Sequence, residues 1–182
     1  MMENFNSNIN NFNIYEANMT NEGEFLKKDQ LMQWITDMIS INYQSQDHQF
    51  DPGKFLIEHG VFYESVNDGE PKGPMHACFH TAALKMLYDP QRKTKYVEGI
   101  QWHGKLSPIY HGWNVVDGQA VDYTITPTSQ DIYFGVSIPN ELVVKAMSNA
   151  QKTRESDFGV LGTLALYKNS LRFLKELEKE YK

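Results

Sequence analysis

The spacing of apolar residues predicts that the chain begins with helices. Between about Glu24 and Ile41 apolar residues recur every three or four positions, which is the pattern of an amphipathic helix. The polar stretch after this run contains Pro52-Gly53, a pair that interrupts helices. The next segment, FLIEHGVFYESV, indicates a short helix, or a helical turn that ends at Gly60 before a strand.

The middle of the chain combines a helix with strands. After the loop sequence NDGEPKGP, the apolar residues from about Ala77 to Tyr88 lie on one helical face. Three runs rich in β-branched and aromatic residues follow, namely TKYVEGIQW, YHGWNVVDG and QAVDYTIT. Asp117-Gly118 separates the second run from the third, and such a pair strongly favours a two-residue hairpin turn. We therefore expect a small antiparallel sheet after the central helix.

The C-terminal part is predicted to be helical. After TPTSQDIYFGVSIP, the segment NELVVKAMSNA has a helical pattern with Asn140 as its expected N-cap. A final helix is expected from about Leu164 to Tyr181. The order of helices, a central helix, an antiparallel sheet and further helices predicts the α+β class.

Length and composition fit one folded domain. The chain has 182 residues, of which 41% are hydrophobic and 13% aromatic, enough to bury an ordinary core. We expect residues 21–182 to form that domain. Residues 1–20 are rich in asparagine and lack a regular apolar period, so they are expected to form a flexible arm, with docking on the domain or on another chain as the alternative.

The charge and hydropathy of the chain narrow its range of partners. The net charge of −6 argues against electrostatic binding of nucleic acid. No stretch approaches the roughly 18–20 apolar residues that a membrane span needs, and the N-terminus lacks a basic start followed by an apolar run. We therefore expect a cytoplasmic protein without nucleic-acid or membrane partners.

Cys78 is the first candidate for chemistry. It is the single cysteine of the chain, so an internal disulfide is impossible. Its place in the first turn of a predicted helix brings it near backbone N–H groups and the positive end of the helix dipole, which favour the thiolate. The alternative is an inert thiol buried in the core.

The predicted hairpin brings a histidine and a carboxylate to one face. A two-residue turn at Asp117-Gly118 places His111 opposite Thr124 and Asp122 opposite Trp113. His111 and Asp122 are then diagonal neighbours on the same face, with backbones roughly 7–8 Å apart and side chains within reach of each other. A carboxylate in that position would fix the tautomer of an imidazole that takes a proton from a thiol.

These segments resemble the transglutaminase-like branch of the papain-like cysteine enzymes. The resemblance rests on CFHTAALKML, HGW and DYT and covers about Pro74 to Thr124. It implies a papain-like fold, with Cys78 as nucleophile, His111 as base and Asp122 as the residue that orients the base. The implied reaction is acyl transfer by amide or peptide hydrolysis, deamidation or transfer to an amine, with no metal or organic cofactor.

The sequence departs from that family around the nucleophile. Phe79 follows the cysteine where many relatives have tryptophan, and NDGEPKGPMHA precedes it where relatives carry a glutamine. The oxyanion donor therefore stays open between the backbone N–H of Cys78 and the side chains of Gln44, Gln46 or Gln49. Trp113, Phe79 and Tyr110 are the candidate substrate-binding residues. For Trp113, core packing beside the site is the main expectation, and shielding of the cysteine and histidine from water is secondary.

Other interpretations of the same residues remain. His76, Cys78 and His80, joined by His103 or His111, would provide zinc ligands, but positions i and i+2 of a helix point about 200° apart. His80 is the second choice as catalytic base, because the same spacing aims it away from Cys78.

The alternative to an enzyme is a binding protein that retains the fold. One example is a small phage or bacterial accessory protein that captures a partner or a small ligand. If the chain is an enzyme, its expected substrates are peptides, proteins or small amides, which the sequence does not rank.

Overall fold

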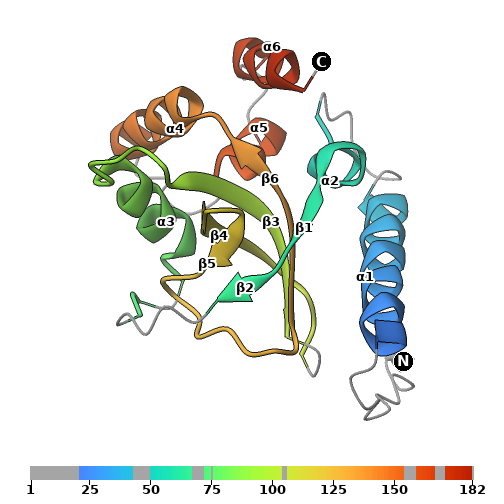
Figure 1. The fold of residues 1–182 in the computed structure, drawn as a ribbon. Helices are drawn as coiled ribbons and strands as arrows, with labels where there is room; N and C mark the ends of the chain where they lie inside the picture. Colours follow the sequence, from blue (N-terminus) through green and yellow to red (C-terminus); the bar gives the residue numbers. More distant parts are fainter. Residues whose placement is uncertain are drawn as a thin grey trace, which may run out of the picture.

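The fold combines helices with one curved sheet (Figure 1). The computed structural model describes residues 21–42, 50–66, 72–74, 76–103, 106–153, 159–166 and 171–181. Within these ranges the helices are α1 (Asn21–Asn42), α2 (Pro52–His59), α3 (Cys78–Leu87), α4 (Asn140–Thr153), α5 (Gly159–Leu166) and α6 (Leu171–Glu180). The strands are β1 (Val61–Tyr63), β2 (Ser65–Val66), β3 (Lys95–His103), β4 (Ile109–Val116), β5 (Gln119–Val121) and β6 (Asp131–Ile138). The expectation of a flexible arm over residues 1–20 lies outside the described residues.

The sheet is larger than the sequence predicts and nearly closes on itself. Its strand order is β1-β6-β3-β4-β5-β2. Neighbouring strands are antiparallel except for β2 and β5, which are parallel. Only Glu64 separates β1 from β2 along the chain, yet these two strands form opposite edges of the sheet. The chain therefore crosses from one edge to the other in a single residue, and the sheet curls to allow it (Figure 1).

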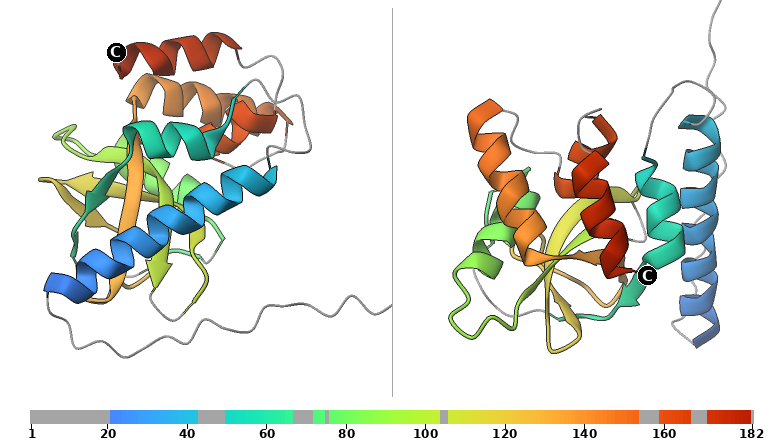
Figure 2. Two further views of the ribbon diagram at one scale, coloured as in Figure 1. Left: turned by 90° about the vertical axis from the view of Figure 1, so that its right-hand side faces the viewer. Right: turned by 90° about the horizontal axis from the view of Figure 1, so that it is seen from above.

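The two faces of the sheet bury different sets of residues. Tyr96 and Ile100 on β3 join Phe134 on β6 in the larger core, which also contains apolar residues of all six helices. The alternate positions face the inside of the curve, where a smaller cluster forms. Its buried members are Val97, Trp113, Val115, Ala120 and Tyr133. The further views in Figure 2 show the helices arranged around the sheet, with α1 lying along its outer side.

Several elements begin and end close to where the pattern predicts them. The central helix begins at Cys78, so the thiol lies in its first turn as expected. Asp117 and Gly118 have φ values of 51° and 85°, as a two-residue type I′ turn requires. Asn114 pairs with Val121 and Val116 with Gln119, which is the predicted register near the turn. The prediction that the pairing continues to His111 and Thr124 is wrong, because β5 ends at Val121 and Asp122 lies just beyond it.

Other predictions about the elements are wrong. The single final helix expected from Leu164 to Tyr181 is two helices, and α5 already begins at Gly159. The sequence did not predict strand β6, whose residues are DIYFGVSI. A short apolar run interrupted by glycine does not show whether a segment is a strand or the lead-in to a helix. Asn140 is not the N-cap of α4, since the carbonyl of Pro139 accepts from Val143 N at 3.1 Å and Asn140 is already helical.

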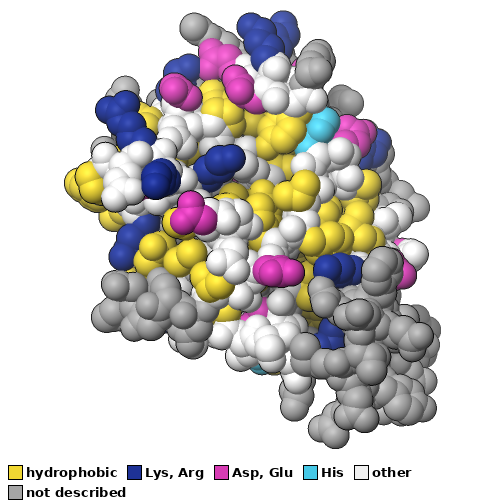
Figure 3. All heavy atoms as spheres, viewed as in Figure 1, with side chains coloured by type: hydrophobic (Ala, Val, Ile, Leu, Met, Phe, Trp, Pro, Cys, Tyr) yellow, Lys and Arg dark blue, Asp and Glu magenta, His cyan; other side chains and the backbone are white. Residues whose placement is uncertain are grey.

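The surface drawn in Figure 3 is mixed in charge, and the described helices are of ordinary length and polarity. Basic and acidic side chains are interspersed on the face drawn in Figure 3. Across the described part of the chain, every helix is too short or too polar to span a bilayer.

Candidate active site

The start of helix α3 presents Cys78 to strand β4. The N-cap residue, Ala77, makes no side-chain hydrogen bond to the helix, so the first-turn N–H groups lack the usual capping oxygen. The N–H of Phe79 in that turn and the N–H of Gly112 on β4 both act on the Cys78 sulfur as hydrogen-bond donors. The thiol is partly buried and lies among groups that stabilise a negative charge.

Gly112 allows the helix to lie this close to the strand. A Cβ atom at Gly112 would lie 2.7 Å from Phe79 Cδ1 and 3.1 Å from Phe79 Cα. Since the second of these atoms is backbone, the helix start could not yield to a side chain without moving as a whole. The missing side chain at position 112 is therefore part of what places Cys78 beside β4.

Replacing Gly112 by alanine is expected to lower Cys78 reactivity at least tenfold and the free energy of unfolding by about 1–3 kcal/mol, as overpacking usually does. The added methyl group pushes the start of α3 away from His111. Alkylation kinetics and urea unfolding measure the two effects. Gly118→Ala is the control: it strains a residue at φ 85° where a Cβ meets nothing within 4 Å, so it lowers stability and leaves reactivity intact. Equal losses of reactivity in the two variants would contradict the prediction.

His111 lies between the thiol and a carboxylate. It lies on β4, is only 2% exposed, and its Nε2 is 2.6 Å from Asp122 Oδ2. Its side chain also forms a hydrogen bond with Cys78. Because Nε2 is hydrogen-bonded to Asp122, the other ring nitrogen, Nδ1, is the one that forms the hydrogen bond with the thiol. The structure thus brings together the three residues predicted as catalytic.

Asp122 is held by five donors. It comes immediately after β5, in line with the hairpin register. Its Oδ1 accepts from Thr124 N at 2.8 Å, Thr124 Oγ1 at 2.9 Å and Ile125 N at 3.0 Å. Its Oδ2 accepts from His111 and from the Tyr133 hydroxyl at 2.9 Å. A carboxylate with this many donors is fixed in position and stays ionised.

The electrostatics favour an ion pair between Cys78 and His111. Burial opposes charge on Cys78, but the hydrogen bond and charge of His111 outweigh it and lower the pKa of the thiol. Burial likewise opposes charge on His111, but Asp122 and Cys78 outweigh it and raise its pKa to about 9. For Asp122, burial is outweighed by His111 and the loop N–H groups, so its pKa is lowered. Both shifts favour a thiolate on Cys78 beside an imidazolium on His111.

Aromatic side chains support the site from behind. The rings of His111 and Trp113 are stacked with centroids 6.2 Å apart, and Tyr133 meets Trp113 edge-on at 5.2 Å. Trp113 has no exposed surface, so it packs in the core behind His111, where a substrate does not reach it. Phe79 is 9% exposed and packs against Tyr110 with centroids 5.3 Å apart. Contact of Phe79 or Tyr110 with substrate stays a prediction.

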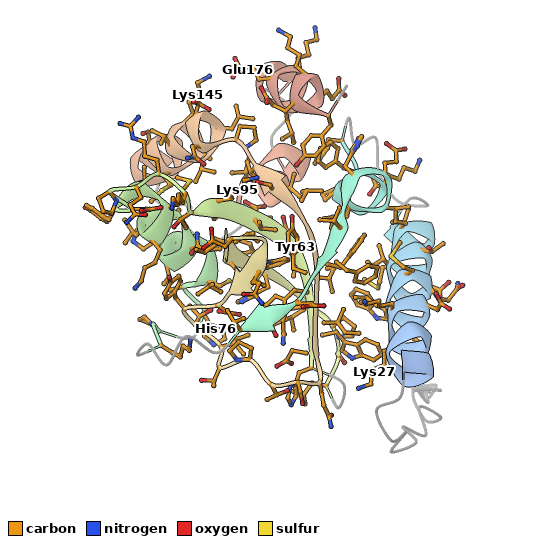
Figure 4. All side chains as sticks on the ribbon, viewed as in Figure 1. Lys27, Tyr63, His76, Lys95, Lys145 and Glu176 are labelled. Atoms are coloured by element: carbon orange, nitrogen blue, oxygen red, sulfur yellow. The ribbon has the colours of Figure 1, made fainter. Side chains whose placement is uncertain are left out.

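The remaining histidines lie in separate environments. His76 is exposed in the loop that leads into α3 (Figure 4), and His80 is exposed on that helix. His103 bonds through Nδ1 to Asp131 Oδ1 at 2.6 Å. Within the described ranges, no three His, Cys, Asp or Glu side chains are arranged to hold a metal ion. The candidate oxyanion donors Gln44, Gln46 and Gln49 lie outside the described residues.

Two contacts that the sequence did not indicate connect the loops of the site. Lys72 Nζ donates to the carbonyl oxygen of Asp122 at 2.6 Å, and Gly73 N donates to the carbonyl of Tyr123 at 2.5 Å. The segment before Cys78 is thereby bonded to the loop that carries Asp122. Such contacts join residues about fifty positions apart, and no local sequence pattern encodes them.

Comparison with known proteins gives no relative for this arrangement. No family model matches the chain, and neither a curated protein nor a solved structure matches it.

Proposed function

We propose that the protein is a cysteine acyl-transfer enzyme of the papain-like, transglutaminase-like type. The observation that carries the proposal is the continuous hydrogen-bonded series from Cys78 through His111 to Asp122. Each member has the environment its role needs: the thiol at a helix start, the imidazole buried between two partners, and the carboxylate saturated with donors.

The proposed reaction begins with attack of the Cys78 thiolate on the carbonyl carbon of an amide. The carbon–sulfur bond forms as the carbonyl π electrons move to oxygen, and first-turn N–H groups of α3, among them that of Cys78, stabilise the oxyanion. His111 then gives its Nδ1 proton to the leaving amine as the carbon–nitrogen bond breaks, which leaves a thioester. Water or a second amine attacks the thioester while His111 accepts its proton, and the thiolate is restored. We place this activity in the cytoplasm, with peptides, proteins or small amides as substrates.

A role as a binding protein explains less of the arrangement. Burying the imidazole of His111 and the carboxylate of Asp122 carries a desolvation cost that a binding surface does not require. Neither side chain is exposed enough to contact a macromolecular partner. The buried pair is accounted for if its purpose is to control the protonation of Cys78.

The first test is the rate of Cys78 alkylation by iodoacetamide between pH 4 and 9. We expect fast modification well below the pKa of about 8.5 of an ordinary thiol, because His111 holds Cys78 as a thiolate. His111→Ala should remove this reactivity at low pH. His103→Ala is the matched control, since His103 is bonded to a buried carboxylate at the same distance but lies away from the thiol. If Cys78 in the native protein reacts only after denaturation, the proposal is wrong.

The second test looks for the covalent intermediate. Incubation with an activated acyl donor such as p-nitrophenyl acetate should add one acyl group to Cys78, detected by mass spectrometry. Release of that group in buffer indicates hydrolysis, whereas faster release with an added primary amine, and recovery of the amide, indicates transfer. Cys78→Ser should accumulate no thioester.

A further inference from the structure

Tyr133 on β6 contacts the site from a strand that takes no part in the hairpin. Its hydroxyl donates to Asp122 Oδ2 at 2.9 Å, the same oxygen that His111 Nε2 contacts at 2.6 Å. Strands β3 and β4 lie between β6 and β5 in the sheet, so the side chain reaches Asp122 across the inside of the curve. Tyr133 has no exposed surface.

The two oxygens of Asp122 are held in different ways. Oδ1 is bonded by groups of its own loop, Thr124 and Ile125. Oδ2, the oxygen that faces His111, has Tyr133 as its other donor. Tyr133 therefore adds a hydrogen bond from outside the loop to the one oxygen of Asp122 that contacts His111.

Contacts around Tyr133 form a closed ring of four side chains. His111 bonds to Asp122, Asp122 accepts from Tyr133, Tyr133 packs edge-on against Trp113, and Trp113 stacks on His111. All four are almost completely buried. A ring of this kind leaves the imidazole one orientation.

We infer that Tyr133 is a positioning residue of the proposed site, whose hydroxyl shares the negative charge of Asp122 Oδ2 and so limits the charge that this oxygen presents to His111. The inference rests on the proposed function. It assigns to β6 a part in the chemistry that the resemblance to known enzymes, limited to about Pro74 to Thr124, does not cover.

Other ionisable groups near His111 and Tyr133 come from several elements. They are Cys78 on α3, Asp122 after β5, Asp131 on β6, Tyr63 on β1 and Lys72 at the carbonyl of Asp122. Tyr63, labelled on β1 in Figure 4, has its ring 6.1 Å from that of Trp113. Tyr133→Phe removes one hydroxyl and leaves all these groups in place, so a change in the titration of His111 reports the lost hydrogen bond.

The test is an NMR titration of His111 in the native protein and in Tyr133→Phe, with the imidazole signals assigned through His111→Gln. With Tyr133 absent as a donor, the full charge of Oδ2 acts on His111, and its pKa is expected to rise by roughly half a unit. A more basic imidazolium releases its proton less readily to the leaving group, so kcat for acyl transfer should fall severalfold while KM stays unchanged.

Tyr96→Phe is the matched control. Tyr96 is equally buried and donates to another buried carboxylate, Glu98 Oε1, at 2.7 Å on the opposite face of the sheet. This variant loses the same hydroxyl and should leave the His111 titration unchanged. In Asp122→Asn the amide nitrogen replaces Oδ2, so adding Tyr133→Phe to that variant should have no further effect on the titration.

The outcomes separate this inference from the proposed function. A native His111 that titrates near 6.5 contradicts the ion pair and with it the proposed function. A native pKa near 9 that Tyr133→Phe leaves unchanged or lowers, or that Tyr96→Phe raises equally, overturns the inference on Tyr133 and leaves the proposed function standing.

Discussion

Replacing Asp122 by asparagine is expected to lower kcat/KM for acyl transfer at neutral pH by about three orders of magnitude. Three donors to Oδ1 keep an oxygen at that position, so the amide nitrogen of the new side chain faces His111 Nε2. An N–H donor there requires Nε2 to accept, which places the imidazole proton on Nδ1, toward Cys78. The ring then cannot take the thiol proton.

The pH dependence of alkylation shows the same change independently of turnover. Without the carboxylate, the pKa of His111 falls from about 9 and the pKa of Cys78 rises, so fast modification moves to higher pH. Asp131→Asn is the control, because Asp131 forms an equally short bond to His103 on the same sheet. If the two variants lose activity equally, or if Asp122→Asn keeps a reactive thiol at low pH, the role of Asp122 is wrong.

Replacing Glu98 by alanine is expected to lower the free energy of unfolding by about 4 kcal/mol, the largest effect on stability that we predict. Glu98 is completely buried on β3 and accepts hydrogen bonds from Tyr96 and Tyr110 hydroxyls at 2.7 and 2.6 Å. It also accepts from the N–H groups of Val160 and Leu161 at the start of α5. Alanine leaves these donors without an acceptor and detaches α5 from the sheet.

Urea unfolding as a function of pH tests the role of Glu98 further. Burial raises its pKa above the ordinary 4.5, and this outweighs the lowering by its four donors. The folded state therefore binds the proton more tightly than the unfolded chain. The stability that Glu98 contributes is fully present below the unfolded pKa and is lost as the pH rises through the higher folded pKa. We expect native and Glu98→Ala proteins to differ more at pH 4 than at pH 7. Tyr96→Phe, which keeps the carboxylate, should lower the free energy of unfolding by only about 1 kcal/mol. A difference in unfolding free energy between native and Glu98→Ala proteins that grows as the pH rises would contradict this account.

The catalytic candidates could be predicted because the signals that place them are local. Asp117-Gly118 determines the turn, the turn determines the register, and the register brings His111 near Asp122. The start of the helix at Cys78 follows in the same way from the loop sequence before it and the apolar period after it. These steps involve residues close in the chain, where backbone preferences decide the outcome.

The supporting residues could not be predicted because their partners are far away in the chain. Tyr133 meets Asp122 only after β6 pairs with β3, and the sequence of β6 did not identify it as a strand. Glu98 interrupts an apolar run in the sequence. Its role as acceptor for the N–H groups of Val160 and Leu161 is visible only in the folded structure. Gly159, at φ 65°, lies against the Glu98 carboxylate and begins α5 earlier than the apolar period indicates. Tertiary contacts, which no local pattern records, decide each of these positions.

The pairing of β1 with β6 has a consequence for the protein during its synthesis. Val61 of β1 pairs with Gly135 of β6. Strand β1 is therefore synthesised early but can pair only after β6, which is synthesised much later. Cys78, His111 and Asp122 all leave the ribosome before Tyr133 and the rest of β6. If Cys78 is the nucleophile that we propose, we expect its thiol to become reactive only after β6 has joined the sheet.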